Sequence, residues 1–287
     1  IWLPLITPFV DGDIDEASLL RLVTHYMKQQ IDGFVVAATT GEGLVLDDPE
    51  IRRVVDIAVD GTAWHRPVFV SLCGSDTRRL AKRLVATAKW PVDGYLITCP
   101  YYSRPSQDGL YQHFAALAGE TDRPILIYNI PYRTGVNMTN DTLLCLAALA
   151  NIVGVKDCCA DVAQSFDLLR RRGPDFAVFT GEDALFLHTL THGADGGILA
   201  SAHVGPNEFA AVRDAVISGR LPDALSQWAQ LIDVVRLLFG EPNPAPIKHV
   251  LWRQGLIASP ELRLPMTRVS AELAERLDQL STVLAVA

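Results

Sequence analysis

The chain has 287 residues, of which 49% are hydrophobic and 20% charged, and it carries a formal net charge of −8. The hydrophobic fraction is enough for a sizeable core, whereas the net negative charge argues against nucleic acid or an anionic membrane as the main partner. No apolar run approaches the roughly 18–20 residues that a membrane-spanning helix needs.

The cysteines indicate a reducing compartment. There are five of them, and their spacing contains no Cys-x-x-Cys pair and no zinc pattern. An odd number of cysteines in a chain of this length favours thiols over disulfides, so we expect a cytoplasmic protein. Charged residues are slightly sparse for a soluble surface, which favours an oligomer in which some of that surface is buried.

Short apolar runs alternate with longer amphipathic stretches over the first 220 residues. The apolar runs predict strands at residues 3–7, 33–37, 67–72, 94–98, 124–128, 152–155, 177–180 and 196–200. The amphipathic stretches predict helices at residues 15–30, 50–60, 77–90, 109–120, 140–150, 161–172, 184–192 and 207–218. Eight strands and eight helices in this order predict an α/β fold, a (β/α)8 TIM barrel. A doubly wound sheet has the same alternation and is the alternative.

The alternation stops after Arg220. Residues 221–239 have a strongly helical pattern, and a proline-rich breaker at residues 240–246 precedes two more helical stretches. We therefore predict a catalytic barrel domain over residues 1–220 and a C-terminal three-helix subdomain over residues 221–287.

Lys156 is the only lysine of the chain that follows an apolar run typical of a buried strand. In a barrel, the side chains that do chemistry lie at the C-terminal ends of strands. An amine must be neutral to attack a carbonyl, and burial or a neighbouring cation lowers a lysine pKa from its ordinary value of about 10.4. Lys156 is therefore a candidate Schiff-base nucleophile, and a structural ion pair with Asp157, Asp161 or another barrel carboxylate is the alternative.

The preceding predicted strand ends at Tyr128 and leads to Arg133. Strands five and six are neighbours in a barrel, so a phenol at one end can transfer protons at an amine on the other. The guanidinium of Arg133 can bind a carboxylate through two hydrogen bonds. The alternatives are a tyrosine that anchors packing and an ordinary surface arginine.

Thr39, Thr40 and Gly41 follow the second predicted strand. Their hydroxyls and backbone amides suit a small carboxylate. The Gly-x-Gly at Gly41 and Gly43 is too short for a dinucleotide or P-loop fingerprint, and a plain turn is the alternative. With Lys156 and Arg133, this turn predicts Schiff-base chemistry on a small carboxylated carbonyl compound.

Two other residue pairs give weaker indications of a functional site. His188 and His192 are spaced as a metal pair could be, but no glutamate follows His188 as in His-Glu-x-x-His, and we expect no metal site. Ser201 and His203 lack the glycine pattern of a nucleophile elbow, which argues against a serine hydrolase.

Five motifs occur in an order that is specific for one family. They are Thr39-Thr-Gly-Glu42, the stretch Tyr101–Tyr111, Tyr128-Asn-Ile-Pro131, Gly154-Val-Lys156 and Asn243-Pro-Ala-Pro-Ile-Lys248. Through them the chain resembles, over essentially its whole length, the dihydrodipicolinate synthase / N-acetylneuraminate lyase family of class I pyruvate aldolases.

The resemblance implies a role for each matching residue. Lys156 matches the lysine that condenses with pyruvate. Tyr128, Thr39 and Tyr102 match a proton relay, in which Tyr102 reaches the site of a neighbouring subunit. Thr40 matches the threonine that holds the pyruvate carboxylate.

Two further positions and the assembly follow from the same resemblance. Ile198 matches a backbone contact in the pyruvate pocket, and Gly181 lies near the substrate entry. The resemblance also implies a homo-oligomer, a tetramer built as a dimer of dimers. It implies no metal and no organic cofactor, because the protonated imine is itself the electron sink.

Arg133 discriminates within the family. Members with Tyr-Asn-x-Pro-x-Arg-Thr-Gly use this arginine for the carboxylate of aspartate semialdehyde, and the motif is present here. The resemblance thus implies condensation of pyruvate with L-aspartate 4-semialdehyde to 4-hydroxy-tetrahydrodipicolinate, in lysine and diaminopimelate biosynthesis. The alternatives are a lyase of the same family acting on a sugar acid or another aldehyde, a metal-dependent class II aldolase, and a non-catalytic ligand-binding barrel.

The chain departs from the family pattern at three places. Asp157, Cys158 and Cys159 stand after the lysine, where a glutamate and small residues are usual, and this leaves the second substrate open. Gly43, Asp48 and Ile51 stand where lysine-inhibited bacterial members have histidines and a serine, and the turn Thr77–Lys82 lacks the carboxylate expected there. We therefore predict weak or absent feedback inhibition by lysine.

Overall fold

The computed structural model describes the backbone of residues 1–284 and the side chains of residues 1–279. The chain forms two compact units. The first joins Ile1–Val68 to the segment that starts at Leu199, and the second is the continuous segment Phe69–Ile198. The predicted boundary after residue 220 falls within the first unit and stays a prediction.

The second unit contains the parallel strands that carry most of the predicted site. Each strand pairs with the next one along the chain. Because both faces of these strands are covered, they read as continuous apolar runs. The strands are β5 (Val68–Leu72), β6 (Gly94–Thr98), β7 (Ile125–Asn129), β8 (Ile152–Asp157), β9 (Ala177–Thr180) and β10 (Gly196–Gly197).

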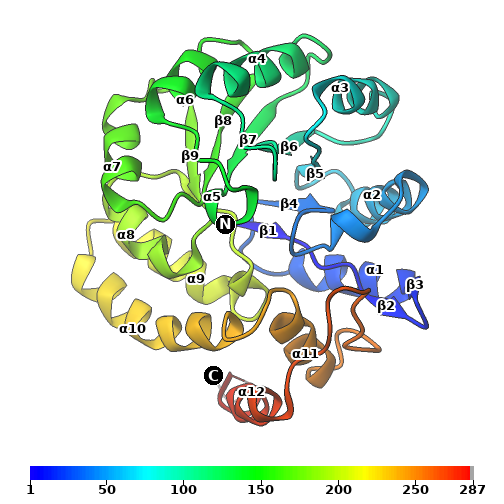
Figure 1. The fold of residues 1–287 in the computed structure, drawn as a ribbon. Coiled ribbons are helices and arrows are strands. Elements are labelled where there is room, and N and C mark those ends of the chain that lie inside the picture. The colour runs from blue at the N-terminus through cyan, green and yellow to red at the C-terminus, as the bar shows by residue number, and fades with distance from the viewer. Residues whose placement is uncertain (285–287) are drawn as a thin grey trace. The chain divides into compact units, whose positions relative to one another are not determined.

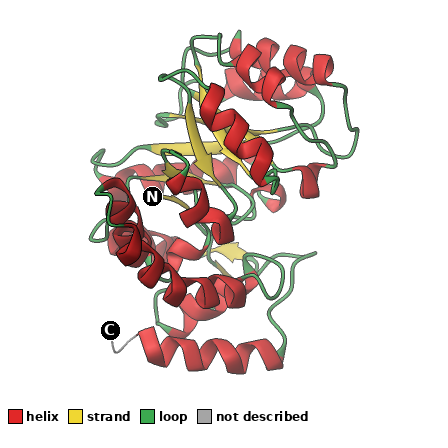
Figure 2. Ribbon diagram, turned by 90° about the vertical axis from the view of Figure 1, so that its left-hand side faces the viewer, coloured by secondary structure: helices red, strands yellow, loops and turns green. Residues whose placement is uncertain are grey.

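Helices cover the outside of these strands, as Figures 1 and 2 show. Their first turns are fixed by side-chain caps: Asp76, Ser106, Thr139 and Asp161 each accept a hydrogen bond from a backbone N–H of the helix that follows. The helical segments are α3 (Thr77–Ala86), α4 (Gln107–Ala118), α5 (Pro131–Thr134), α6 (Asn140–Leu146), α7 (Val162–Arg171), η2 (Asp183–Leu185) and α8 (Phe186–Thr191).

The first unit is built from both ends of the chain. Strand β1 (Trp2–Pro4) pairs in parallel with β4 (Gly33–Val36), and the Leu199 N–H donates to the Trp2 carbonyl over 3.1 Å. The other elements are the hairpin β2 (Phe9–Val10) and β3 (Asp13–Ile14), with the helices α1 (Glu16–Tyr26), η1 (Gly43–Val45), α2 (Asp48–Thr62), η3 (Ser201–His203), α9 (Pro206–Ile217), α10 (Leu221–Leu238), α11 (Ala245–Arg253) and α12 (Ala271–Leu284).

The observed alternation is the one expected for a (β/α)8 barrel, and each predicted strand is present at its place in the chain. Three strand ends differ from the prediction by two or three residues. Strand β1 ends at Pro4, three residues before the predicted end. Strand β8 continues through Lys156 to Asp157, because these two residues pair with Tyr128 and Asn129 on β7. Strand β10 ends at Gly197, three residues before the predicted end.

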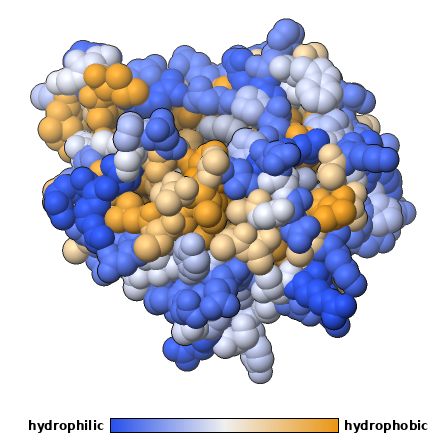
Figure 3. Space-filling model, turned by 90° about the horizontal axis from the view of Figure 1, so that it is seen from above, coloured by the Kyte–Doolittle hydropathy of each residue, from blue (hydrophilic) through white to orange (hydrophobic). Residues whose placement is uncertain are grey.

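The surface gives one further observation. Among the described residues, no helix is long and apolar enough to cross a membrane. On the face drawn in Figure 3, apolar residues gather in patches between polar ones.

Candidate active site

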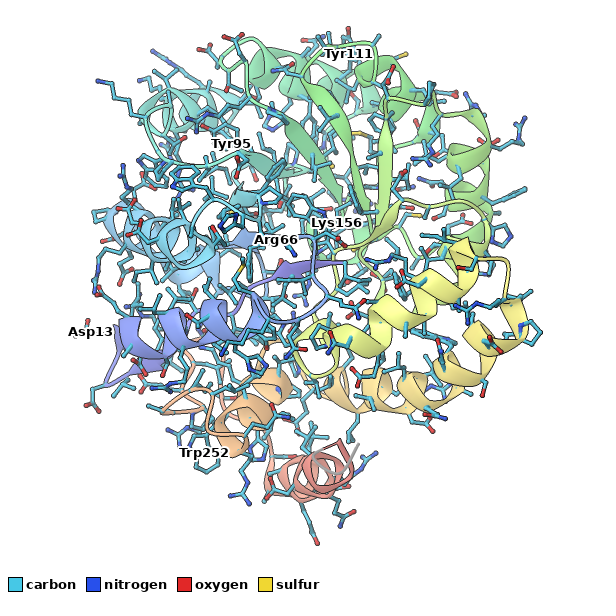
Figure 4. All side chains as sticks on the ribbon, turned by 180° about the vertical axis from the view of Figure 1, so that it is seen from behind. Asp13, Arg66, Tyr95, Tyr111, Lys156 and Trp252 are labelled. Carbon is cyan, nitrogen blue, oxygen red and sulfur yellow. The ribbon has the colours of Figure 1, made fainter. Side chains whose placement is uncertain are left out.

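Lys156 and Tyr128 lie opposite each other on neighbouring strands. They are register partners of β8 and β7. Both side chains are buried, with exposed fractions of 5% and 4%. The Lys156 amine lies 4.4 Å from the centroid of the Tyr128 ring. Figure 4 shows Lys156 at one end of these strands, which is the C-terminal end where the sequence predicted the nucleophile.

The surroundings of Lys156 favour its neutral form. Burial lowers the pKa of the Lys156 amine below its ordinary value, and this outweighs the opposing influence of Cys158, Asp183 and Glu182. The positive charge of Arg133 lowers the same pKa further. A neutral amine at the end of a strand is what nucleophilic attack on a carbonyl requires.

The alternative is a structural ion pair of Lys156 with Asp157, Asp161 or another barrel carboxylate. Asp183 and Glu182 are such carboxylates, and their charges raise the Lys156 pKa less than burial lowers it. Asp157 and Asp161 are engaged elsewhere. Successive residues of a strand point to opposite faces, so Asp157 is directed away from Lys156. Its carboxylate accepts hydrogen bonds from the Ser165 hydroxyl (2.5 Å) and the Cys159 N–H (3.1 Å). Asp161 caps α7 through the N–H groups of Ala163 and Gln164.

Gly181 makes room for the lysine. A Cβ atom at this position would lie 2.4 Å from Lys156 Cε and 2.4 Å from Cys158 Sγ, so any other residue here would displace these two side chains. The Gly181 N–H donates to the Asp157 carbonyl over 2.8 Å and so ties the end of β9 to β8. Ile198 is buried and donates its N–H to the Thr180 carbonyl, beside the same strand end.

Three residues that were not predicted as site residues lie close to Lys156 and Tyr128 or to each other. The Cys158 thiol is hydrogen-bonded to Tyr128 and to Glu182, and the Tyr132 hydroxyl is hydrogen-bonded to Glu182. Burial raises the pKa of the Glu182 carboxyl and of the Cys158 thiol. A signal existed in the sequence, because Glu182 lies two residues after the end of the seventh predicted strand and Cys158 stands two residues after Lys156.

Arg133 and Tyr102 belong to the same unit and are exposed. Arg133 lies on the short helix α5, with its guanidinium 5.8 Å from the centroid of the Tyr132 ring. Tyr102 is 93% exposed and has a left-handed backbone with φ of 70°, and its N–H donates to the Thr134 carbonyl. The backbone of Tyr102 is thus fixed to α5 while its ring projects into solvent.

Thr39 and Thr40 belong to the first unit, in the turn that follows β4. The Glu42 N–H donates to the Thr39 carbonyl over 3.1 Å and closes the turn. Thr40 is 3% exposed, and its hydroxyl accepts a hydrogen bond of 2.9 Å from the Asn243 side chain. The sequence analysis used Asn243 only as part of a motif and did not predict this contact.

The histidine pair that the sequence analysis considered lies on α8 and at its end. The ring centroids of His188 and His192 are 4.4 Å apart, and Nδ1 of His192 lies 2.7 Å from the His188 carbonyl oxygen. Within the described residues, no group of three or more histidine, cysteine or carboxylate side chains could hold a metal ion.

Comparison with known proteins gives the family. The sequence profile described as "Dihydrodipicolinate synthetase family" matches residues 1–283. The chain belongs to this family. A relative from Clostridium acetobutylicum, named 4-hydroxy-tetrahydrodipicolinate synthase 2, is 43% identical over 279 residues, which cover 97% of this chain and 98% of the relative.

Solved structures of the family confirm the predicted (β/α)8 barrel. The dihydrodipicolinate synthase of Aquifex aeolicus matches with a TM-score of 0.95 and 33% identity, over 99% of this chain and 97% of the other. The enzyme of Acinetobacter baumannii, described as chloride-inhibited and complexed with pyruvate, matches with a TM-score of 0.95 and 31% identity, over 100% of this chain and 98% of the other.

Proposed function

We propose that the chain is a lyase that condenses pyruvate with L-aspartate 4-semialdehyde, the reaction of a 4-hydroxy-tetrahydrodipicolinate synthase. The observation that carries the proposal is the buried amine of Lys156, with its lowered pKa, beside the Tyr128 ring. The name of the Clostridium acetobutylicum relative and the pyruvate bound to the Acinetobacter baumannii enzyme support the same reading.

In the proposed mechanism, the Lys156 nitrogen attacks the ketone carbon of pyruvate and forms a carbinolamine. Loss of water gives a protonated imine, which draws electrons from the neighbouring methyl carbon. Tyr128, with Thr39 and the Tyr102 of a neighbouring subunit, transfers protons so that the imine becomes an enamine. Thr40 and the backbone at Ile198 hold the pyruvate carboxylate during these steps.

The second half of the proposed reaction uses the exposed arginine. Arg133 binds the carboxylate of the semialdehyde, near the entry at Gly181, and directs its aldehyde carbon towards the enamine. A carbon–carbon bond forms, and the product amine then displaces Lys156 as the ring closes. The protonated imine acts as the electron sink throughout, so no step of this scheme requires a cofactor.

The proposed assembly is a homotetramer, a dimer of dimers, in the cytoplasm. The 93% exposed ring of Tyr102 supports an oligomer, because an aromatic ring on a fixed backbone is suited to contact a second subunit. Analytical ultracentrifugation checks the assembly. A single monomeric species at the concentration of the activity assay would contradict it.

The mechanism is tested by trapping the imine. The protein is treated with pyruvate and borohydride, and the modified peptide is identified by mass spectrometry. A reduced pyruvyl group on Lys156, absent from Lys156→Ala, is the expected result. A folded protein without an adduct would contradict the Schiff-base mechanism and leave a ligand-binding or metal-dependent protein.

A second aldehyde is a further candidate, because Cys158 and Glu182 add acidic groups near Lys156 and Tyr132 adds a phenol on Glu182. These groups could select hydroxyls of a sugar acid rather than a semialdehyde. Pyruvate consumption is therefore measured with aspartate semialdehyde and with sugar-acid-forming aldehydes. We expect the highest kcat/KM with aspartate semialdehyde. A higher kcat/KM with a hydroxyaldehyde would contradict the main proposal and support the sugar-acid alternative.

A further inference from the structure

The threonine turn of the first unit is held by residues that come about 200 positions later in the chain. The Asn243 amide nitrogen donates to the Thr40 hydroxyl oxygen over 2.9 Å. Both side chains are buried, with exposed fractions of 7% for Asn243 and 3% for Thr40. A buried hydrogen bond between side chains so distant in sequence is a specific feature of the fold, not a local turn effect.

This contact fixes the direction in which the threonine hydroxyl can donate. A hydroxyl has one hydrogen and two lone pairs. Because the Thr40 oxygen accepts from Asn243, its own hydrogen must point to a different partner. In the described part of the chain the Thr40 hydroxyl makes no other hydrogen bond, so its hydrogen is available to an acceptor brought by a ligand.

The backbone of the turn is fixed as well. Glu42 adopts a left-handed conformation with φ of 53°, and its carboxylate forms a fully buried ion pair with Lys248. The Arg263 N–H donates to the same carboxylate over 3.1 Å. A Cβ atom on Gly41 would lie 2.7 Å from the Leu5 carbonyl oxygen, so the turn is also packed closely against β1's continuation.

The Lys248 amine has two further contacts on its other sides. It donates to the Glu261 carbonyl over 2.8 Å and lies 4.2 Å from the centroid of the Phe9 ring. The turn that bears Thr40 therefore cannot shift to compensate for a lost Asn243 hydrogen bond without breaking a buried charge pair.

We propose that Asn243 is a positioning residue for the reaction: it orients the Thr40 hydroxyl so that this group donates its hydrogen to the carboxylate of pyruvate. The inference rests on the proposed function and adds a residue to it. Asn243 does not touch the substrate in this scheme and acts only through Thr40. The Asn243 Oδ1 is buried and has no hydrogen-bond partner in the described residues. The side-chain contact of Asn243 is therefore made by its amide nitrogen.

The experiment is a double-mutant cycle read as the KM for pyruvate. Asn243→Ala and Thr40→Val are each expected to raise this KM roughly 10-fold, the loss typical of one hydrogen bond to a charged group. In the Thr40→Val background, Asn243→Ala is expected to have no further effect. Independent effects that multiply in the double variant would overturn the proposal.

Asn243→Asp provides a second variant of nearly the same shape. An ionised carboxylate can only accept hydrogen bonds, so it would take the Thr40 hydrogen and repel the pyruvate carboxylate. We expect a larger rise in the pyruvate KM than in Asn243→Ala. A KM equal to that of the unmodified protein in both Asn243 variants, with folding confirmed by circular dichroism, would refute the positioning role.

Asn207→Ala is the matched control. Asn207 lies on α9 of the same unit, is exposed, and also links two segments by side-chain hydrogen bonds, to Gln29 and Gln30. It is expected to leave the pyruvate KM unchanged. Borohydride trapping on the wild-type protein distinguishes failure of the proposed function from failure of this inference. If no adduct forms on Lys156, the proposed function is contradicted. If the adduct forms but Thr40→Val leaves the pyruvate KM unaltered, only the role of Thr40 is contradicted.

Discussion

At the scale of single residues, the site depends on burial and close approach more than on residue type. Lys156 is a candidate nucleophile because the interior lowers the pKa of its amine, and Gly181 leaves the space that its side chain fills. The sequence indicated Lys156 because it follows an apolar run, and Tyr128 because it ends the preceding one. It could not indicate the contact between Cys158 and Glu182, since that contact depends on how the loops after β8 and β9 fold back.

Tyr128 is expected to be essential for turnover and dispensable for folding. Tyr128→Phe keeps the ring beside the Lys156 amine but removes the hydroxyl to which the proposed mechanism assigns proton transfer. We predict a fall in kcat of roughly 10²–10⁴-fold, the size of a lost acid–base group. Steady-state kinetics check this, with Tyr111→Phe on α4 as the control because Tyr111 lies at the surface. A kcat within a factor of two of the wild type would exclude Tyr128 from the relay.

Glu182 is expected to set the pH range of imine formation. Its negative charge raises the pKa of the Lys156 amine, against the larger lowering by burial. Removing that charge in Glu182→Gln should lower the pKa further, so the rate of adduct formation should reach its plateau at a lower pH. The rate of borohydride trapping is measured against pH, with Glu120→Gln as an exposed control. A shift to higher pH would contradict the assignment.

At the scale of elements, the alternation of apolar and amphipathic stretches predicted the strands well. Period and composition are local properties, and parallel strands buried on both faces display them clearly. The hairpin at Phe9–Val10 and Asp13–Ile14 and the short helix at Pro131–Thr134 were not predicted, because segments this short carry no period. The end of β8 was missed since charged Lys156 and Asp157 do not resemble a strand interior.

The ion pair between Lys248 on α11 and Glu42 after β4 could not be predicted either, because no local sequence pattern indicates a contact between residues so far apart in the chain. Removing one partner leaves an uncompensated buried charge, which typically costs about 3–5 kcal/mol. We predict that Lys248→Met lowers the free energy of unfolding by about this amount. Urea denaturation measures it.

The double variant Glu42→Gln with Lys248→Met tests the pairing directly. With both charges gone, part of the lost stability should return. Lys82→Met, an exposed lysine of α3, is the control and should change the stability by less than about 0.5 kcal/mol. A double variant as unstable as the sum of the singles would show that the two side chains act independently.

At the scale of the whole molecule, stability is expected to depend on pH through a buried histidine. His203 is 2% exposed; its Nε2 accepts the Ile6 N–H over 3.2 Å, and its Nδ1 lies 2.8 Å from the Ala200 carbonyl oxygen. Burial lowers the pKa of His203 to about 4. Because an unfolded histidine titrates near pH 6.5, the unfolded chain binds an extra proton between about pH 6.5 and 4.

The contribution of His203 to the free energy of unfolding should therefore be constant above about pH 6.5. As the pH drops towards 4, the free energy of unfolding should fall by up to about 3 kcal/mol. Urea midpoints at pH 7 and pH 4.5 check the effect. His203→Gln is expected to lose less stability between the two pH values than the wild type, and His65→Gln, at the surface, to behave as the wild type. Equal losses in all three proteins would exclude His203 as the cause.

Feedback inhibition by L-lysine would act on the assembled molecule, and we expect it to be weak or absent. Gly43, Asp48 and Ile51 supply none of the imidazole and hydroxyl groups that the resemblance associates with lysine inhibition. We predict that millimolar L-lysine leaves the initial rate unchanged. Calorimetry with L-lysine is the independent measurement, and tight binding to the ligand-free protein would contradict the prediction.

The discontinuous first unit has a consequence for the order in which the protein matures during translation. Residues 69–198 leave the ribosome as one continuous segment, so the strands bearing Tyr128 and Lys156 have emerged before the last part of the first unit is made. Thr40 emerges long before them, yet its turn obtains Asn243, Lys248 and Arg263 only from the last part of the chain. A chain terminated before residue 243 would thus carry Lys156 and Tyr128 but would lack the side chains that hold the turn of Thr40 and Glu42.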